Sequence, residues 1–196
     1  MGDLNLNSLV LQCFDDLKEG LEACGQKEGV LVKAAETISK AIAAGKTVYL
    51  CGNGGSASEC QHLAAEFVGR FLMERPGLPA WALTTDTSKL TAIGNDYGFE
   101  QVFTRQIKAV GRPGDVLWGL STSGVSPNVI GALREAKSSG LKTIFMCGNT
   151  IHEEGLADLI ISTPGKTTPR VQELHLLFGH IICQLVDEIL FGDRRP

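Results

Sequence analysis

The sequence predicts a single α/β domain in which helices cover both faces of a parallel β-sheet. The chain has 196 residues, 43% of them hydrophobic, which is enough apolar material for one sizeable core but not for two. After a helical first quarter, short apolar runs alternate with helix-patterned segments. These runs are continuously apolar, as strands are when helices cover both faces of a parallel sheet.

The first 45 residues are predicted to form two helices. Apolar side chains recur at three- and four-residue spacing along two stretches between Leu4 and Ala44. Gly45 then ends the second helix. We expect this helical pair, residues 1–45, either to pack on the domain or to pair with another copy of the chain.

Strands and helices alternate from Lys46 onward. Five apolar runs are predicted to be strands: Lys46–Gly52, Pro79–Thr84, Asp115–Ser121, Lys142–Gly148 and Leu159–Thr163. Four segments are predicted to be helices: Ser56–Met73, Thr87–Val110, Ser126–Ser139 and Pro169–Leu190. Ligands of such sheets bind beyond the carboxyl ends of the strands. The loops after the first and third strands are therefore the candidate binding loops.

Composition excludes several classes of function. A net charge of −4 provides no basic surface for general nucleic-acid binding. Six scattered cysteines without a C-x-x-C pair are typical of reduced thiols in the cytosol. No apolar run is expected to span a bilayer, and the N-terminus has no export signal, so we expect a cytoplasmic protein without membrane contact.

The loop after the third strand is rich in hydroxyl side chains. It reads STSGVSP, with hydroxyls at Ser121, Thr122, Ser123 and Ser126. Together with the partly positive amides of a helix N-terminus, these groups can hold a phosphate dianion without lysine. Helix capping is the alternative use of Ser and Thr here, but four hydroxyls exceed what a cap requires.

The loop after the first strand is rich in glycine. Asn53, Gly54, Gly55 and Ser56 join strand to helix, and glycine lets a ligand approach the backbone closely. Its pattern matches neither the dinucleotide-binding nor the P-loop fingerprint, so nucleotide binding is not supported.

A further polar pair, Asn95 and Asp96, interrupts an apolar helical stretch. Both are common at helix ends, which is the structural interpretation. Beside two ligand loops, they are also candidates for hydrogen bonds to sugar hydroxyls.

Potential metal-ligating side chains occur on two predicted helices. His62 and Glu66 are four residues apart and share a face, so they can converge on one ion, although this spacing is common on ordinary helices. The last helix carries Gln172 and His180, separated by about 12 Å of helical rise and about 80° of rotation. One ion binds both only if the side chains lean inward or come from neighbouring chains. His175 is the rival ligand or a packed core residue.

Taken together, these segments resemble the phosphoheptose isomerases of the sugar isomerase (SIS) domain superfamily. The resemblance rests on four stretches and covers Lys46 to Phe191, and the leading helices also fit: CGNGGSASECQHLAAEFVGRF, ERPGLPAWALTTDTSKLTAIGNDYGFEQVF, GRPGDVLWGLSTSGVSPNV and TPRVQELHLLFGH. It implies a Rossmann-like three-layer sandwich with a five-stranded parallel sheet, and a homotetramer with active sites between subunits. It also implies conversion of sedoheptulose 7-phosphate to D-glycero-D-manno-heptose 7-phosphate, the entry to ADP-heptose and lipopolysaccharide.

The resemblance also implies roles for individual residues. Zinc would bind His62, Glu66, Gln172 and His180, with Glu66 and His180 catalysing proton transfer. The implied substrate contacts are Asn53, Gly54, Gly55, Ser56, Glu66, Asn95, Asp96, Ser121, Thr122, Ser123, Ser126 and Gln172. The chain departs from the family pattern at Val125, where Asn is frequent, at Gly94, where Ala is frequent, and over residues 147–158.

Two other functions compete with catalysis. A noncatalytic protein of the same fold, like the replication-initiator-associating protein, would lack an acidic residue at Glu66 and the pair Gly179-His180, which this sequence has. A sugar-phosphate-sensing regulator would carry a DNA-binding domain, for which no residues remain. We therefore expect an enzyme.

Overall fold

The computed structural model describes residues 5–25, 27–148, 153 and 155–192. Five strands form one sheet in the order β2-β1-β3-β4-β5, and all neighbouring pairs are parallel. The strands are β1 Val48–Cys51, β2 Ala80–Ala82, β3 Val116–Ser121, β4 Lys142–Cys147 and β5 Leu159–Ser162. Each lies within its predicted run, so the five-stranded parallel sheet is confirmed.

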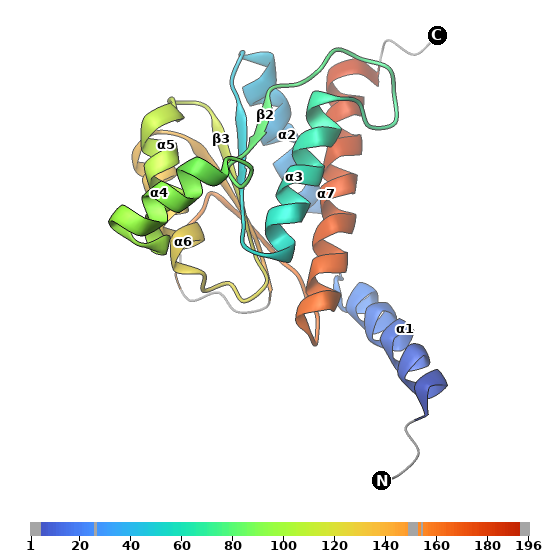
Figure 1. Cartoon of the computed structure of the whole chain (residues 1–196). Helices are drawn as coiled ribbons and strands as arrows, with labels where there is room; N and C mark the ends of the chain where they lie inside the picture. Colours follow the sequence, from blue (N-terminus) through green and yellow to red (C-terminus); the bar gives the residue numbers. More distant parts are fainter. Residues whose placement is uncertain (1–4, 26, 149–152, 154, 193–196) are drawn as a thin grey trace.

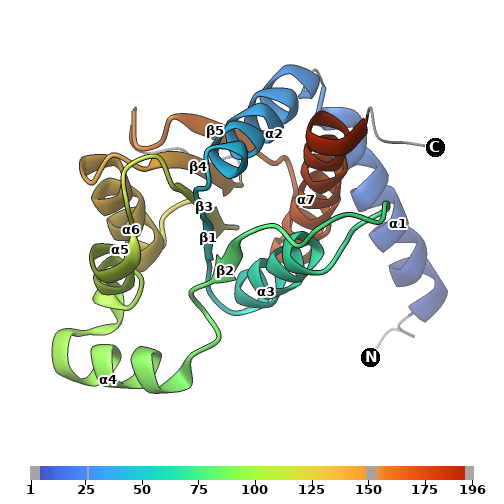
Figure 2. The same ribbon diagram turned by 90° about the horizontal axis from the view of Figure 1, so that it is seen from above.

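Helices cover both faces of the sheet and complete a three-layer sandwich (Figures 1 and 2). They are α1 Leu6–Ala23, α2 Glu28–Ala43, α3 Gly55–Val68, α4 Thr87–Tyr97, α5 Thr104–Val110, α6 Pro127–Ser138 and α7 Thr168–Phe191, with a 3-10 turn, η1, at Phe99–Gln101. Helices α2, α3 and α7 pack together on one face, and α5 and α6 cover the other.

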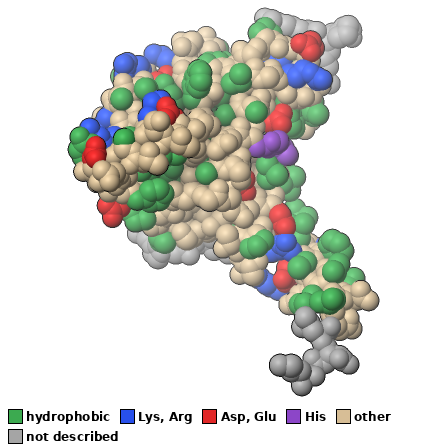
Figure 3. Space-filling model, viewed as in Figure 1, with side chains coloured by type: hydrophobic (Ala, Val, Ile, Leu, Met, Phe, Trp, Pro, Cys, Tyr) green, Lys and Arg blue, Asp and Glu red, His purple; other side chains and the backbone are tan. Residues whose placement is uncertain are grey.

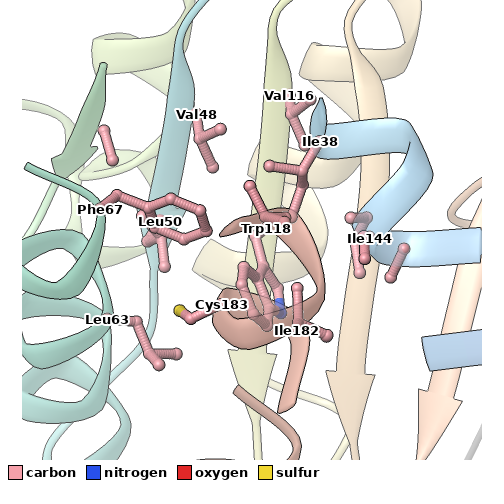
Figure 4. Packing of buried hydrophobic residues seen from close by; sticks show 14 of the residues in the cluster. Ile38, Val48, Leu50, Leu63, Phe67, Val116, Trp118, Ile144, Ile182 and Cys183 are labelled. Carbon is pink, nitrogen blue, oxygen red and sulfur yellow. The ribbon is translucent and has the colours of Figure 1, made fainter. Parts of the chain in front are cut away.

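Each face of the sheet contributes to its own apolar cluster. On the α3 and α7 side, Trp118 of β3 is fully buried among Phe67 of α3 and Ile182 of α7 (Figure 4). On the opposite side, Phe103 and Leu133 pack over the sheet. Burying a side chain of this size contributes roughly 1.5–3 kcal/mol, so the first cluster fixes α3 and α7 on the sheet and the second fixes α5 and α6.

Two predicted helices are shorter than expected. The helix predicted over Ser56–Met73 ends at Val68. The helix predicted over Thr87–Val110 is divided into α4, η1 and α5, because Gly98 adopts φ +88° and this backbone conformation ends a helix. Residues with a Cβ atom rarely adopt a positive φ, whereas glycine does so readily. Apolar periodicity alone carries no signal for such a break, since Leu90 and Ile93 still pack on the same cluster as α5.

The two leading helices behave differently. Helix α2 packs against α7 and β5, whereas α1 extends away from the body of the molecule (Figure 1). Arg170 donates to the Cys13 carbonyl, and Lys166 pairs with Asp16, which attaches α1 to the start of α7. The exposed apolar side chains of α1 include Leu6, Leu9, Val10, Leu11 and Phe14 (Figure 3).

Helix α7 corrects one sequence expectation. Its 24 residues, with a mean hydropathy of 1.5 over an 18-residue window, are long and apolar enough to cross a membrane by length and composition. The helix packs against α2 and α3, however, and buries His175 and Asp187. Its apolar composition is explained by its place in the core.

Candidate active site

The glycine-rich loop brings α3 close to α7. Gly54, at φ +54°, is the N-cap residue of α3, and Gly55 begins the helix. A Cβ atom built on Gly55 would lie 2.0 Å from Nε2 of Gln172, so a larger residue fits here only if the Gln172 side chain moves. The Gln172 side-chain amide therefore lies directly beside the backbone of the glycine-rich loop, at the carboxyl edge of the sheet.

The hydroxyl side chains of the second loop converge. The Oγ atoms of Ser121 and Ser126 are 2.9 Å apart, and those of Ser121 and Ser123 are 3.4 Å apart. Ser126 is the N-cap residue of α6, yet its side chain makes no capping hydrogen bond. The hydroxyls face one another rather than the helix amides, so capping does not account for them. Thr122 is partly buried within the same loop.

An unpredicted residue, Asn128 of α6, connects the two loops. Nδ2 of Asn53 donates to Oδ1 of Asn128, and Nδ2 of Asn128 donates to Oδ1 of Asn53, both at 2.8 Å. Asn128 is buried, and its Oδ1 also accepts from the Val129 amide. A buried amide with all these partners is a rigid link, so Asn128 holds the glycine loop against the helix that begins at the hydroxyl loop. The only sequence signal for it is an Asn in the first turn of a predicted helix.

His62, Glu66 and His180 form a cluster on adjacent helices. One potential ligand atom from each lies within 4.8 Å of the other two. Nε2 of His62 is 2.8 Å from Nε2 of His180 and 3.4 Å from Oε1 of Glu66. The cluster reaches the surface, where histidine side chains are visible in Figure 3. Tertiary packing thus joins two sequence motifs that lie 118 residues apart.

The environment of His180 favours its neutral form. The pKa of His180 is lowered, first by burial and then by the nearby His62, while the carboxylate of Glu66 opposes this effect. Phe71 stacks on the His180 ring with centroids 5.5 Å apart. A neutral imidazole retains a lone pair, which can accept a proton or bind a cation.

The remaining predicted residues lie at different places. Gln172 is eight residues from His180 on α7, roughly 12 Å along the helix, and contacts the Gly55 region. Asn95 and Asp96 are exposed in the last turn of α4, where Nδ2 of Asn95 donates to Oδ1 of Asp96. The structure therefore places this pair at a helix end, as the structural interpretation expected.

His175 is a buried core residue that faces Glu59 of α3. Its ring is fully buried, with Nδ1 4.0 Å from Oε2 of Glu59. Burial lowers the pKa of His175 to about 4 and raises the pKa of Glu59 to about 7, so both tend toward the neutral form. Of the two roles that the sequence left open for His175, the geometry matches the packed one.

The donors of the cluster suit a divalent cation. Two imidazole nitrogens and one carboxylate oxygen form the His₂Glu set found at catalytic zinc sites, which retain an open position for water or substrate. The exposed side of the cluster provides such access, since the His62 side chain is 44% exposed. The donor chemistry therefore fits zinc.

Comparison with known proteins identifies the family. Residues 12–148 match the family model described as SIS domain. The chain is 53% identical to a phosphoheptose isomerase of Maridesulfovibrio salexigens, over 87% of this chain and 85% of that protein. It is 55% identical to a phosphoheptose isomerase of Burkholderia pseudomallei, over 83% of each. The chain belongs to the phosphoheptose isomerase family. A solved phosphoheptose isomerase of Neisseria gonorrhoeae has 38% identity and a TM-score of 0.85, covering 94% of this chain and all of that one.

The positions that the sequence singled out as departures from the family pattern lie in different parts of the fold. Val125 is 43% exposed, and its amide donates to Oγ of Ser123 in the hydroxyl loop. Gly94 lies within α4. The departure over 147–158 falls partly outside the described residues.

Proposed function

We propose that this chain converts sedoheptulose 7-phosphate to D-glycero-D-manno-heptose 7-phosphate in the cytoplasm, the entry step to ADP-heptose. The observation that carries the proposal is the convergence of His62, Glu66 and His180 on adjacent helices. Family membership supports the substrate, and the grouped hydroxyls of Ser121, Ser123 and Ser126 suit its phosphate. The proposed homotetramer and the downstream use in lipopolysaccharide rest on the family resemblance.

The reaction requires a proton to leave C1 and another to arrive at C2. We assign Glu66 as the base that removes the C1 proton, giving an enediolate, and His180 as the partner acid/base that supplies the proton arriving at C2. One ligand atom of each of Glu66, His62 and His180 lies within 4.8 Å of the others, which supports Glu66 and His180 acting on the same substrate.

We propose zinc as the cofactor, held by His62, Glu66 and His180, with Gln172 as a further ligand. A bound divalent cation would polarise the substrate oxygens and offset the negative charge of the enediolate. A carboxylate that binds a cation is a weaker base, so Glu66 is expected to release it when it removes the proton.

We further propose that two subunits complete each active site. In one chain, Gln172 and the binding loops lie at the carboxyl edge of the sheet, while Glu66 follows Gly55 by eleven residues, roughly 16 Å along α3. The exposed apolar side chains of α1 offer a surface for contact with another copy, which is one of the two placements that the sequence left open for the leading helices. A neighbouring chain could then bring its Gln172 and loops to the cluster of the first.

The direct test is turnover of sedoheptulose 7-phosphate by the purified protein, followed by the appearance of the aldose phosphate. We expect activity that a chelator removes and that Zn²⁺ restores. Glu66→Gln should abolish turnover while the sugar phosphate still binds, because the amide is nearly the same size but cannot accept the C1 proton. Binding without turnover by the wild-type chain would favour the noncatalytic alternative, and an active Glu66→Gln variant would refute the assigned base.

Mixing inactive variants tests the shared site. Gln172→Ala and His180→Ala chains, unfolded and refolded together, should regain activity if one chain supplies Gln172 and its neighbour supplies His180. Refolding each variant alone is the matched control and should give no activity. If the mixture stays inactive although size analysis shows mixed oligomers, each site belongs to one chain.

A further inference from the structure

Arg75 is a buried arginine that closes the C-terminal end of α3. It lies in the loop after the helix, with 1% of its side chain exposed. Its guanidinium donates to the carbonyl oxygens of Glu66 at 2.8 Å and Phe67 at 2.7 Å. Two further bonds, each 3.1 Å, reach the carbonyls of Gly69 and Pro76.

These bonds satisfy groups that a helix end normally leaves unpaired. The last carbonyls of a helix have no partner within it and carry partial negative charge. Gly69 caps α3 through its amide, which donates to the Ala65 carbonyl, and the guanidinium donates to the carbonyls of Glu66 and Phe67, the second of which also accepts from the Leu78 amide. A planar group with several donors at fixed angles holds these carbonyls in one arrangement, which a single ammonium cannot do.

The same guanidinium also binds α7. Its Nε donates to Oδ1 of Asp187 at 2.8 Å, and the Asp187 side chain is 2% exposed. Asp187 lies seven residues after His180 on α7, about two helical turns and nearly the same face. One side chain therefore bonds the backbone of Glu66 on α3 and the helix that carries His180.

We propose that Arg75 is a positioning residue for the proton-transfer pair. By fixing the last turn of α3 to α7, it keeps the Glu66 carboxylate within reach of His62 and His180. The expected effect on turnover rests on the proposed function. The position of the Glu66 carboxylate relative to His62 and His180 does not depend on it. A displacement of about 1 Å at a reacting group typically lowers the rate about 100-fold.

Arg75→Lys tests the role, because lysine retains the charge but cannot reach all five acceptors. We expect kcat for sedoheptulose 7-phosphate to fall at least about tenfold while KM stays within about twofold, since the phosphate loop is not involved. Co²⁺ affinity, followed by visible absorption, should fall about 10- to 100-fold, as when partners behind metal ligands are lost. Asp187→Asn, which keeps the shape and one acceptor but removes the charge, should give a smaller loss of both.

Asp115→Asn is the matched control. Asp115 is also buried, and its carboxylate accepts from the amides of Thr47 and Arg112, outside α3 and α7. This variant should lose stability but keep kcat and Co²⁺ affinity. The proposal is overturned if folded Arg75→Lys keeps the wild-type kcat and Co²⁺ affinity, or if Asp115→Asn loses as much kcat and Co²⁺ affinity as Arg75→Lys does. If Arg75→Lys does not fold, Asp187→Asn decides by the same criteria. If the wild type has no turnover, the proposed function fails, and Co²⁺ affinity still tests the positioning role.

Discussion

Gly179 is the position where a single added methyl group should disturb the site most. It lies on α7 immediately before His180 and faces Leu63 of α3, whose side chain is fully buried. A Cβ atom built on Gly179 would lie 2.6 Å from Cδ2 of Leu63 and 2.8 Å from Cδ1. Ordinary carbon contacts are about 3.5–4.0 Å, so Gly179→Ala must push α3 and α7 apart by roughly 1 Å or force Leu63 into another rotamer.

The expected magnitudes follow from this overlap. Overpacking a core destabilises a protein by about 1–3 kcal/mol, and replacing glycine by alanine within a helix stabilises it by about 1 kcal/mol. The free energy of unfolding should therefore fall by up to about 2 kcal/mol. Activity should fall further, about 100-fold in kcat, because separating the helices moves His180 away from His62 and Glu66.

Denaturant unfolding and steady-state kinetics measure both effects, and Gly29→Ala serves as the control. Gly29 lies on α2 with no atom within 4 Å of its built Cβ, so this variant should gain up to about 1 kcal/mol and keep full activity. Leu63→Val lacks the two clashing δ carbons and should restore much of the activity of Gly179→Ala. Wild-type stability and kcat in Gly179→Ala, or no rescue by Leu63→Val, would refute the reasoning.

Three further outcomes are expected. Asn128→Ala removes both bonds to Asn53 and should raise KM for the sugar phosphate about tenfold with a smaller change in kcat; unchanged kinetics would exclude Asn128 as a link between the loops. Burial lowers the pKa of His175 to about 4 from 6.5, so the unfolded chain binds the extra proton between these values and stability falls as pH drops from 6.5 to 4. His175→Leu should lose part of this acid sensitivity in denaturation curves, and an identical pH dependence would contradict the assignment. Gly94→Ala places its Cβ 3.9 Å from Val102, an ordinary contact, and should stabilise the chain by up to about 1 kcal/mol; a less stable variant would reveal a constraint on α4.

The sequence predicts the sheet well because each strand is a continuous apolar run between turn residues. All five strands lie within their predicted limits. Helix ends are harder, because they depend on groups distant in sequence. At the end of α3, the guanidinium of Arg75 bonds the carbonyls of Glu66 and Phe67, which it can reach only once the loop has folded back. No periodicity records such a contact.

The candidate site divides in a similar way. Residues that act within one loop, such as Ser121 and Ser126, are visible as a local excess of hydroxyl side chains, and the structure brings their Oγ atoms to 2.9 Å. Asn128 has no comparable signal, since its partner Asn53 is 75 residues away. The sequence left His175 as either a metal ligand or a core residue, because spacing predicts which face of a helix a residue occupies but not whether that face is buried.

The position of α3 relative to α7 determines whether the site can form at all. Three contacts set this register in turn along the two helices. Gly55 admits the Gln172 side chain, Gly179 admits Leu63, and Arg75 bonds Asp187. The His62–His180 pair lies between the first and the last of these contacts, so its 2.8 Å separation is a consequence of helix packing rather than of local sequence. It follows that substitutions at Gly179 or Arg75, which touch neither the phosphate loop nor the proposed ligands' side chains, should lower kcat more than they raise KM.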